Sequence, residues 1–407
     1  MSIIVGTDLS AASSGALAVA RALAAQRNDP EVVFVHVIDE EANPEAAREK
    51  LDAQVAAAGA GVGIRAELVV GAAVDETLLG FADTEGSDLI IIAAASSASS
   101  LGTTAEKVIT STRVPVLVLR DAQPWLDFAT GTKPLRLLAA VDDSIASELA
   151  LQWLHGLRRK GPVEVVLGAI YYPDDAAEHY GVESKALVDR DPEVEQLLAR
   201  DMLRRFGAPA TALTRRGLGR IGDHLVELAR DEKVAVVVVG TSQKTGIGRL
   251  GSVSSIVVHD APQSVVCVPP NAAIPTLVMP AVDSALVATD LSPFANRAVA
   301  YAFATIPPTG EIHLAHVVDE DADIDEAEVT RTLLALAPAG QTRKLSAYVV
   351  RGNDAAVAIA QTAARLGVDM ITIASHGRSG LTRALMGSVA DKLLRATRKP
   401  VLVLRPG

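Results

Sequence analysis

A glycine-spaced, basic segment near the end of the chain has the residue types of an anion-binding loop. It reads ASHGRSGLTRALMGS, from Ala374 to Ser388, and lies between an apolar run and a helix-like run. Glycine lacks a Cβ atom and lets the backbone approach a phosphate, and the free N–H groups of a helix's first turn favour an anion. Arg378 and Arg383 add positive charge to an otherwise acidic protein. The segment therefore favours phosphate binding.

Residues around this loop suggest further contacts with a ligand. The N–H groups of the first helical turn would come from Gly387, Ser388 and Val389, and the Ser388 hydroxyl would add a donor. His376 lies inside the loop, where it can contact a ligand. Asp290 ends an apolar run and can accept a hydrogen bond from a ribose hydroxyl or an adenine amino group. The alternative is that Gly387 and Ser388 form an ordinary turn, in which small residues are needed only for close packing.

A pattern repeated three times along the chain positions these residues. Each repeat begins with an apolar run that ends in Asp, followed by Ser and a helix-like stretch; the equivalent aspartates are Asp8, Asp142 and Asp290. Strand-like runs then alternate with amphipathic helix-like stretches, and the central runs DLIIIA, AVVVVG and DMITIA are apolar throughout. This alternation predicts a parallel sheet with helices on both faces.

The predicted fold class is therefore α/β, with three tandem, doubly wound, parallel five-stranded sheets of the Rossmann-like type. We expect domains over residues 1–121, 134–271 and 283–407, separated by connectors that contain Pro or Gly. In such sheets ligands bind at the carboxyl ends of the strands, where the winding direction reverses. Asp290 and the basic loop are both predicted at that edge.

Composition excludes several classes of function. The formal charge of −11 argues against a nucleic-acid or anionic-membrane surface. The longest apolar runs, such as VAVVVVG at 234–240, are shorter than the ~20 residues that span a bilayer. The chain begins MSIIVGTDLS, which does not resemble an export signal, so we expect a cytoplasmic protein. Cys267 is the only cysteine and lies in an apolar run, which predicts a packed thiol.

The corresponding loops of the other two repeats are shorter. The second reads GTSQKTGIGRLGSVSS, has Gln243 in place of the middle glycine, and predicts a weaker site made of Asp142, Gly240, Gly251 and Ser252. The first reads AAASSASSLGTTAEK and keeps only Gly102 and Thr103 of the glycine pattern. Its loop has no cation to compensate a buried phosphate, so we expect a structural turn there.

The segments ATDLSPFANRAVAYA and ASHGRSGLTRALMGSVADKLLRATRKPVLVLR resemble a universal stress protein domain, and the likeness covers the whole chain as three tandem copies. Such domains share a fold with the adenine nucleotide alpha hydrolases. Nucleotide-binding members carry Gly, two residues, Gly, nine residues, then Gly-Ser or Gly-Thr. Ala374 stands where the first glycine is expected, followed by Gly377 and the Gly387-Ser388 pair. Alanine would weaken the match only at a position that needs positive φ.

The resemblance implies that ATP or another adenine nucleotide binds, mainly in the third domain. Asp290 and the backbone of Val317 would hold the nucleoside. The ribose and phosphates would be surrounded by Ile373, Ala374, Gly377, Gly387, Ser388 and Val389, with His376 and Arg378 beside them. Mg²⁺ is a candidate for neutralising the phosphates. The implied function is a stress-response regulator in which nucleotide shifts a conformation or a partner contact.

Two other classes of function stay open. An ATP-hydrolysing enzyme of the adenine nucleotide hydrolase group would usually carry a Ser-Gly-Gly loop after its first strand, where this chain reads TDLSPFAN. The chain also has no lysine-bearing Walker loop and no Ser/His/Asp arrangement, so we expect at most a weak ATPase. The other class is an assembly scaffold that binds no nucleotide, which the degraded first loop favours.

The last strand of each repeat indicates how the chain could assemble. Universal stress protein domains typically pair through this strand, an apolar edge that would otherwise be open. The runs VPVLVLR and SVVCVPP can pair within the chain, which leaves KPVLVLR without a partner. The resemblance therefore implies a homodimer through the third domain.

Two further patterns are interpreted as structural. The segment GLGRIG, 217–222, has the letters of a dinucleotide-binding loop, but the other repeats place an ordinary turn before the third helix at this point. His36 and His316 occupy equivalent places in their second strands, with no Cys or carboxylate at metal-ligand spacing nearby. We therefore expect half-buried strand histidines.

Overall fold

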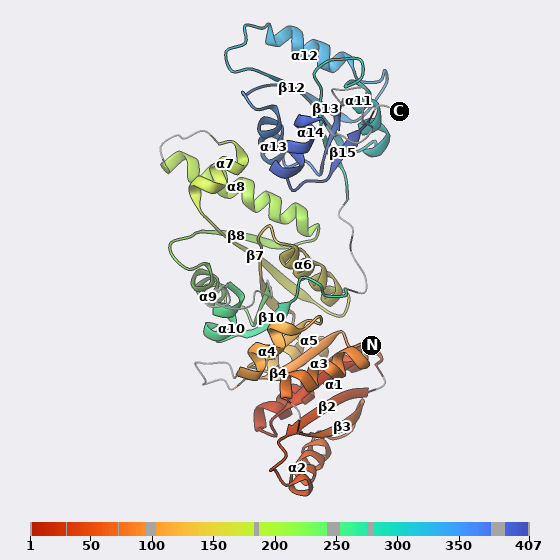
Figure 1. The fold of residues 1–407 in the computed structure, drawn as a ribbon, viewed down its shortest axis with the longest axis vertical. Coiled ribbons are helices and arrows are strands. Elements are labelled where there is room, and N and C mark those ends of the chain that lie inside the picture. The colour runs from red at the N-terminus through yellow and green to blue at the C-terminus, as the bar shows by residue number, and fades with distance from the viewer. Residues whose placement is uncertain are drawn as a thin grey trace. The chain divides into compact units, whose positions relative to one another are not determined.

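The computed structural model describes residues 2–29, 31–71, 73–94, 103–182, 187–241, 253–274, 278, 281–375 and 387–405. They form two compact units (Figure 1). Unit 1 consists of Met1–Tyr171 and Ala208–Met279, and unit 2 of Tyr172–Gly207 and Pro280–Gly407.

Unit 1 contains one sheet with the order β3-β2-β1-β4-β5-β10-β9-β6-β7-β8. Its first half consists of β1 (Ile3–Thr7), β2 (Glu31–Ile38), β3 (Gly63–Val70), β4 (Leu89–Ala93) and β5 (Val116–Leu119), with helices α1 (Ala11–Arg27), α2 (Pro44–Ala57), α3 (Val74–Thr84), α4 (Thr103–Ser111) and α5 (Gln123–Ala129). Its second half consists of β6 (Leu135–Ala140), β7 (Val163–Tyr171), β8 (Thr211–Arg216), β9 (Val236–Gly240) and β10 (Ser264–Val268), with α6 (Ile145–Arg158), α9 (Ile221–Asp231) and α10 (Val253–Asp260). Each half is a parallel five-stranded sheet, as predicted.

The two halves join where β5 pairs with β10 in antiparallel fashion. This pairing within the chain confirms the prediction from the two apolar last strands. Cys267 lies opposite Val116 in the seam and is completely buried, which confirms a packed thiol. Arg120 crosses the seam, because its guanidinium donates to the carbonyl oxygen of Val258 at 2.8 Å. Helices α3, α4, α9 and α10 cover one continuous core over both halves.

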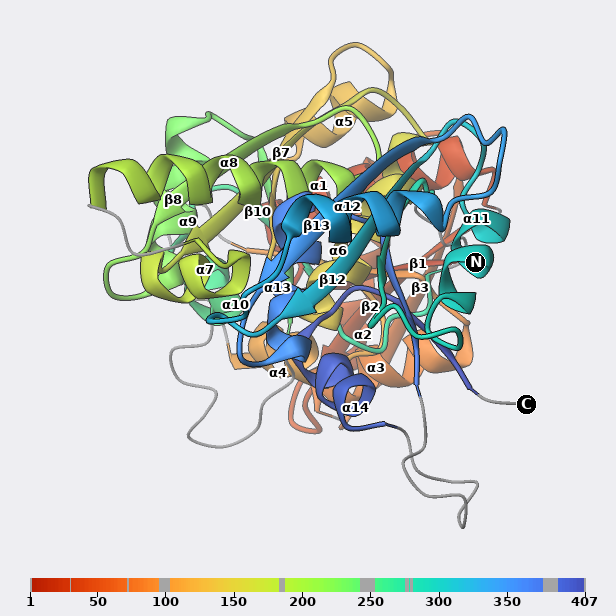
Figure 2. The same ribbon diagram turned by 90° about the horizontal axis from the view of Figure 1, so that it is seen from above.

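Unit 2 contains a parallel sheet with the same winding, β13-β12-β11-β14-β15. Its strands are β11 (Ser284–Ala288), β12 (Glu311–Val318), β13 (Lys344–Arg351), β14 (Met370–Ala374) and β15 (Val401–Leu404), and its helices include α11 (Arg297–Thr305), α12 (Glu326–Ala335), α13 (Ala355–Leu366) and α14 (Ser388–Ala396). Helices α11 and α12 pack on one face, and α13 and α14 on the other (Figure 2). The predicted fold class is confirmed.

A helical insertion from the second repeat belongs to unit 2. Helices α7 (Pro173–Tyr180) and α8 (Leu187–Phe206) follow β7 in the chain but pack on the third repeat. Arg204 of α8 donates to the Ser284 hydroxyl at 2.8 Å and to the Asp369 carboxylate at 3.1 Å. Arg200 donates to the carbonyl oxygen of Arg365 at the end of α13, at 2.7 Å. The sequence pattern did not predict this placement.

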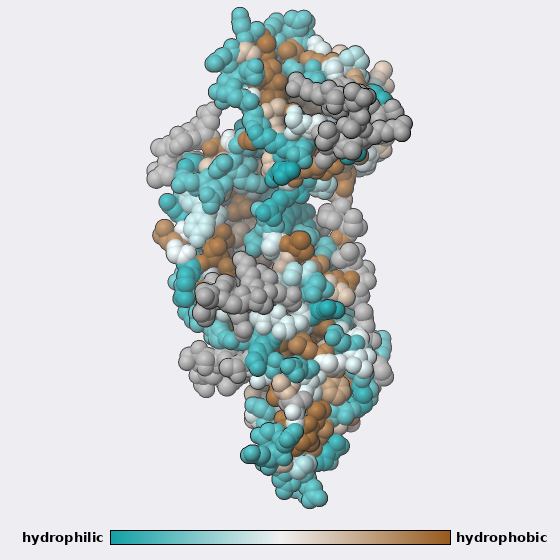
Figure 3. All heavy atoms as spheres, in the orientation of Figure 1, coloured by the Kyte–Doolittle hydropathy of each residue, from teal (hydrophilic) through white to brown (hydrophobic). Residues whose placement is uncertain are grey.

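The surface is mixed in polarity. Figure 3 shows hydrophilic and hydrophobic residues interspersed on the face that it draws. Within the described ranges, no helix is both long and apolar enough to cross a membrane.

Candidate functional site at the carboxyl edge of the third sheet

The ends of β11 and β14 form the centre of the candidate site. These two strands are neighbours, with Ala288 opposite Ile373 in a parallel register. Strand β12 lies on the other side of β11, so the winding reverses between β11 and β14. Ligands bind at such a reversal point in open α/β sheets. Asp290, just after β11, and Ser375, just after β14, therefore follow neighbouring strand ends, as predicted for Asp290.

A tight turn fixes the backbone at Asp290. The Asp290 carboxylate accepts the N–H group of Ser292 at 2.9 Å, and the Thr289 hydroxyl accepts the N–H group of Leu291 at 3.0 Å. Leu291 adopts a left-handed φ of 65°, an unusual conformation for a residue with a branched side chain. His316 of β12 donates from Nδ1 to the carbonyl oxygen of Thr289 at 2.9 Å. The side chains of Thr289 and His316, the Ser292 N–H group and a left-handed backbone at Leu291 thus define the position of the Asp290 carboxylate.

The first repeat contains the same turn with one difference. Asp8 accepts the Ser10 N–H group at 2.9 Å, and His36 donates to Thr7 as His316 does to Thr289. Both histidines are half-buried strand residues, as interpreted from the sequence. In addition, the Ser13 hydroxyl donates to the Asp8 carboxylate at 2.6 Å. Burial alone would raise the pKa of Asp8, but the hydrogen bonds from Ser10 and Ser13 hold it below its ordinary value.

The third repeat has Ala295 at the position equivalent to Ser13. An alanine has no hydroxyl to donate, so the internal bond that Ser13 makes to Asp8 has no counterpart from this position. The second repeat keeps the serine as Ser147, whose hydroxyl accepts the N–H group of Asp142 at 3.1 Å. The immediate surroundings of the three aspartates therefore differ, although their turns begin at equivalent strand ends.

The Ser375 hydroxyl links the end of β14 to the start of α14. Ser375 is buried, its N–H group donates to the carbonyl oxygen of Leu404 at 2.9 Å, and its Oγ accepts the N–H group of Gly387 at 2.7 Å. Gly387 is the N-cap of α14 and no side chain caps the helix. The Gly387 N–H group is thus already bonded, while Ser388 and Val389 lie in an uncapped first turn. Such a turn favours an anion.

Ala374 requires no positive φ. It is the last residue of β14 and pairs with Leu404, and it is not among the described non-glycine residues with positive φ. The equivalent Gly240 has a different role, because a Cβ atom there would lie 2.6 Å from the backbone nitrogen of Ser147 in α6. Helix α11 begins only at Arg297, after a stretch of turns from 293 to 296, and the Ala374 methyl group fits in the core.

The structure describes some of the other residues predicted for the site, and the rest lie outside its described ranges. The side chain of Ile373 is buried in the core beneath α13 and α14, and the partly buried Val317 packs against the same core. His376, Gly377, Arg378 and Arg383 lie outside the described residues, as do Gly251 and Ser252 of the second repeat. The segment 217–222 joins β8 to α9, which confirms its interpretation as a turn before the third helix.

Sequence reasoning missed Ser375 and Thr289. Both are polar residues directly after an apolar strand, and this position was a signal that could have identified them. In the part of the chain that the structure describes, no group of three or more His, Cys, Asp or Glu residues could hold a metal ion.

Comparisons with known proteins agree with this architecture. The model of the universal stress protein family matches residues 1–120, 135–269 and 282–405. The universal stress protein Rv2005c of Mycobacterium tuberculosis is 32% identical over 200 residues, covering 44% of this chain and 64% of that protein. A protein of Mycobacterium bovis, Mb2028c, matches to the same extent. The match therefore spans less than two thirds of these relatives' length.

Solved structures include a universal stress protein from Archaeoglobus fulgidus, with a TM-score of 0.47 and 16% identity over 66% of this chain and 98% of that one. The family match carries the assignment, because it covers most of the chain in three consecutive copies. The chain belongs to the universal stress protein family.

Proposed function

We propose that this protein is a cytoplasmic stress-response regulator that binds ATP or a related adenine nucleotide, mainly in its third domain. The nucleotide would act as a switch by binding more tightly to one of two conformations. Any hydrolysis would be slow and incidental. This proposal uses the three domains expected over 1–121, 134–271 and 283–407.

One observation supports this site above the others. The fixed turn at Asp290 and the uncapped start of α14 lie at the ends of two neighbouring strands, at the reversal point of the sheet. A carboxylate suits the hydroxyl or amino donors of a nucleoside, and a helix start suits a phosphate. The basic loop residues Arg378 and Arg383 would add charge to the phosphate side. Mg²⁺ would accompany the phosphates rather than occupy a protein cage.

The first domain would be structural and the second would bind weakly. In the first domain, the Ser13 hydroxyl also donates to the Asp8 carboxylate, and its loop has no cation. In the second domain, the glycine at 240 is explained by the close approach of α6 rather than by a ligand. These differences favour one main site in each chain.

Strand β15 would join two chains. All four of its residues are partly exposed, whereas the four residues of β5, which pairs with β10, are buried. Pairing of β15 with its copy would cover an open edge in the way that β10 covers β5. The proposed assembly is a homodimer through the third domain.

Native mass spectrometry of the purified protein tests nucleotide binding. The parent is expected to carry adenine nucleotide, and Asp290→Ala and Gly377→Val are expected to lose it. Asp8→Ala is the matched control, since it changes the equivalent aspartate of the first domain and should retain the nucleotide. A parent that carries none, even after incubation with ATP and Mg²⁺, would instead support the scaffold function. Loss of the nucleotide in Asp8→Ala alone would move the site to the first domain.

A further inference from the structure

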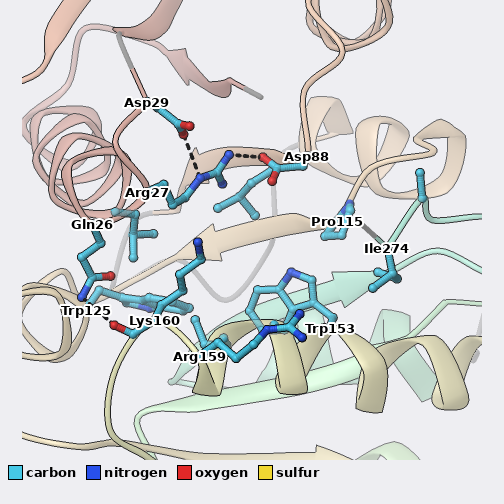
Figure 4. A pocket seen from close by; sticks show the side chains of 15 residues that line it. Gln26, Arg27, Asp29, Asp88, Pro115, Trp125, Trp153, Arg159, Lys160 and Ile274 are labelled. Atoms are coloured by element: carbon cyan, nitrogen blue, oxygen red, sulfur yellow. Dashed lines mark hydrogen bonds and ion pairs between the residues drawn. The ribbon is translucent and has the colours of Figure 1, made fainter. Parts of the chain in front are cut away.

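A pocket lies between the two halves of unit 1. Its volume is about 410 Å³, within the range of small-molecule sites. The first half lines it with the end of α1, the residues that start β4 and precede β5, and α5, and the second half with the last turns of α6 and residues 273–274. Figure 4 shows these side chains around a common hollow. Leu89 begins β4 and Pro115 precedes β5, so the pocket lies at the amino ends of these strands, opposite the carboxyl edge of the same sheet, where Asp8 follows β1.

Both tryptophans of the chain line this pocket. The sequence has only Trp125 and Trp153, and aromatic residues make up only 3% of it. Trp125 is buried and packs edge-to-face against Phe128, with ring centroids 6.4 Å apart. Trp153 is half-buried, so part of its indole ring stays accessible to a ligand. Leu89, Pro115 and other apolar residues complete a lining that suits a planar apolar group.

The charges around the pocket are unequally compensated. Arg27 is held by two carboxylates, Asp29 at 2.8 Å and Asp88 at 2.6 Å. Arg159 and Lys160, both exposed, also line the pocket, and neither forms an ion pair with a residue in the described ranges. Two cations thus remain for an anionic ligand. The carboxylates beside Arg27 would repel a polyphosphate, which favours a ligand with a single negative charge.

We propose that this pocket binds an aromatic monoanion, such as an aromatic carboxylate or sulfonate. Its ring would pack on the exposed part of Trp153, and its acidic group would pair with Arg159 and Lys160. An arginine beside an aromatic surface is well suited to a planar anion. Because residues of both halves line the pocket, bound ligand would also stabilise their association. This site is independent of the nucleotide proposal.

The fluorescence of the two tryptophans gives a direct assay. The probe is 8-anilinonaphthalene-1-sulfonate, an aromatic monoanion that accepts energy from nearby tryptophans. Titration of the full chain should give saturable energy transfer with one probe per chain, and excess ATP should not displace it. The competitors are 1-naphthoate and 1-naphthylmethanol, which share a ring system and differ in charge. Naphthoate is expected to compete at least about tenfold better, which corresponds to about 1.4 kcal/mol.

The double variant Arg159→Ala/Lys160→Ala should abolish the difference between the two competitors without abolishing competition by naphthylmethanol. Lys50→Ala, which removes an exposed cation of α2, is the matched control and should preserve the difference. Trp153→Phe should reduce the energy transfer. The proposal is overturned if the parent binds both competitors equally, if the double variant keeps the preference, or if energy transfer is absent.

Discussion

The hydroxyl oxygen of Ser375 accepts the N–H group of Gly387 at 2.7 Å, so the residue after β14 is bonded to the residue before α14. The two residues flank the basic loop segment. Their bond sets the distance between strand end and helix start without any ligand, and thereby reduces the entropy that ligand binding must remove. A buried serine at this position is therefore a positioning residue for the proposed nucleotide site.

Ser375→Ala should lower both stability and nucleotide affinity. It leaves the partly buried Gly387 N–H group without its protein partner, and loss of such a hydrogen bond costs about 1 kcal/mol. Urea unfolding and titration with a fluorescent ATP analogue measure the two effects. Ser388→Ala, at an exposed position, is the control, since it should lower nucleotide affinity without lowering stability. If Ser375→Ala loses stability but keeps full affinity, the bond has no role in the site.

Asp369 should contribute more to the stability of unit 2 than Arg204 does. The Asp369 carboxylate accepts the N–H groups of Asp283 and Ser284 at 3.0 and 2.8 Å, as well as the guanidinium of Arg204. Asp369→Ala leaves these donors unpaired and should cost about 2–3 kcal/mol. Arg204→Ala removes a half-exposed ion pair and should cost about 1 kcal/mol or less. The test is urea unfolding monitored by circular dichroism. Equal losses of unfolding free energy in the two variants would contradict this order.

Asp354 should make unit 2 sensitive to acid. The ion pair with Lys392, together with the N–H groups at the start of α13, lowers the pKa of Asp354. A lowered pKa gives stability that is present above the unfolded value of about 3.9 and is lost as the pH falls through the folded value. The stability difference between the parent and Asp354→Asn should therefore stay nearly constant from pH 7 to about 4 and shrink at lower pH. A difference that is constant with pH in urea titrations would refute this assignment.

Cys267 should report on the seam between β5 and β10. Burial raises the pKa of its thiol to about 12, and it lies opposite Val116 in the pairing of the two strands. The thiolate is the reactive form, so labelling by a disulfide reagent at about pH 8 should require opening of the seam. The same thiol should react rapidly in urea, where its pKa returns to about 8.5. Rapid labelling of the native protein would show that the seam opens readily.

The features that the sequence predicted are those with local or repeated signals. Apolar runs ending in Asp located the strand ends at Asp8, Asp142 and Asp290, and the paired apolar last strands predicted the seam at Cys267. The placement of α7 and α8 depended instead on tertiary contacts, such as that between Arg204 and Asp369, which no local pattern encodes. The reason for a glycine at position 240 likewise required the structure, which shows the close approach of α6. In sequence, a glycine needed for close packing looks the same as a glycine of a phosphate-binding loop.

Val403→Pro should convert the proposed dimer into a monomer. The carbonyl oxygens of Pro400 and Leu404 accept hydrogen bonds from β14, so the backbone groups of Val403 point to the open edge of β15. The equivalent Val118 of β5 pairs there with Val265 of β10. Proline removes the outward N–H group and leaves the bonds to β14 intact. Light scattering at micromolar concentration should show a dimer for the parent and a monomer for the variant. A parent that is monomeric, or a dimer that persists after deletion of 283–407, would refute pairing through β15.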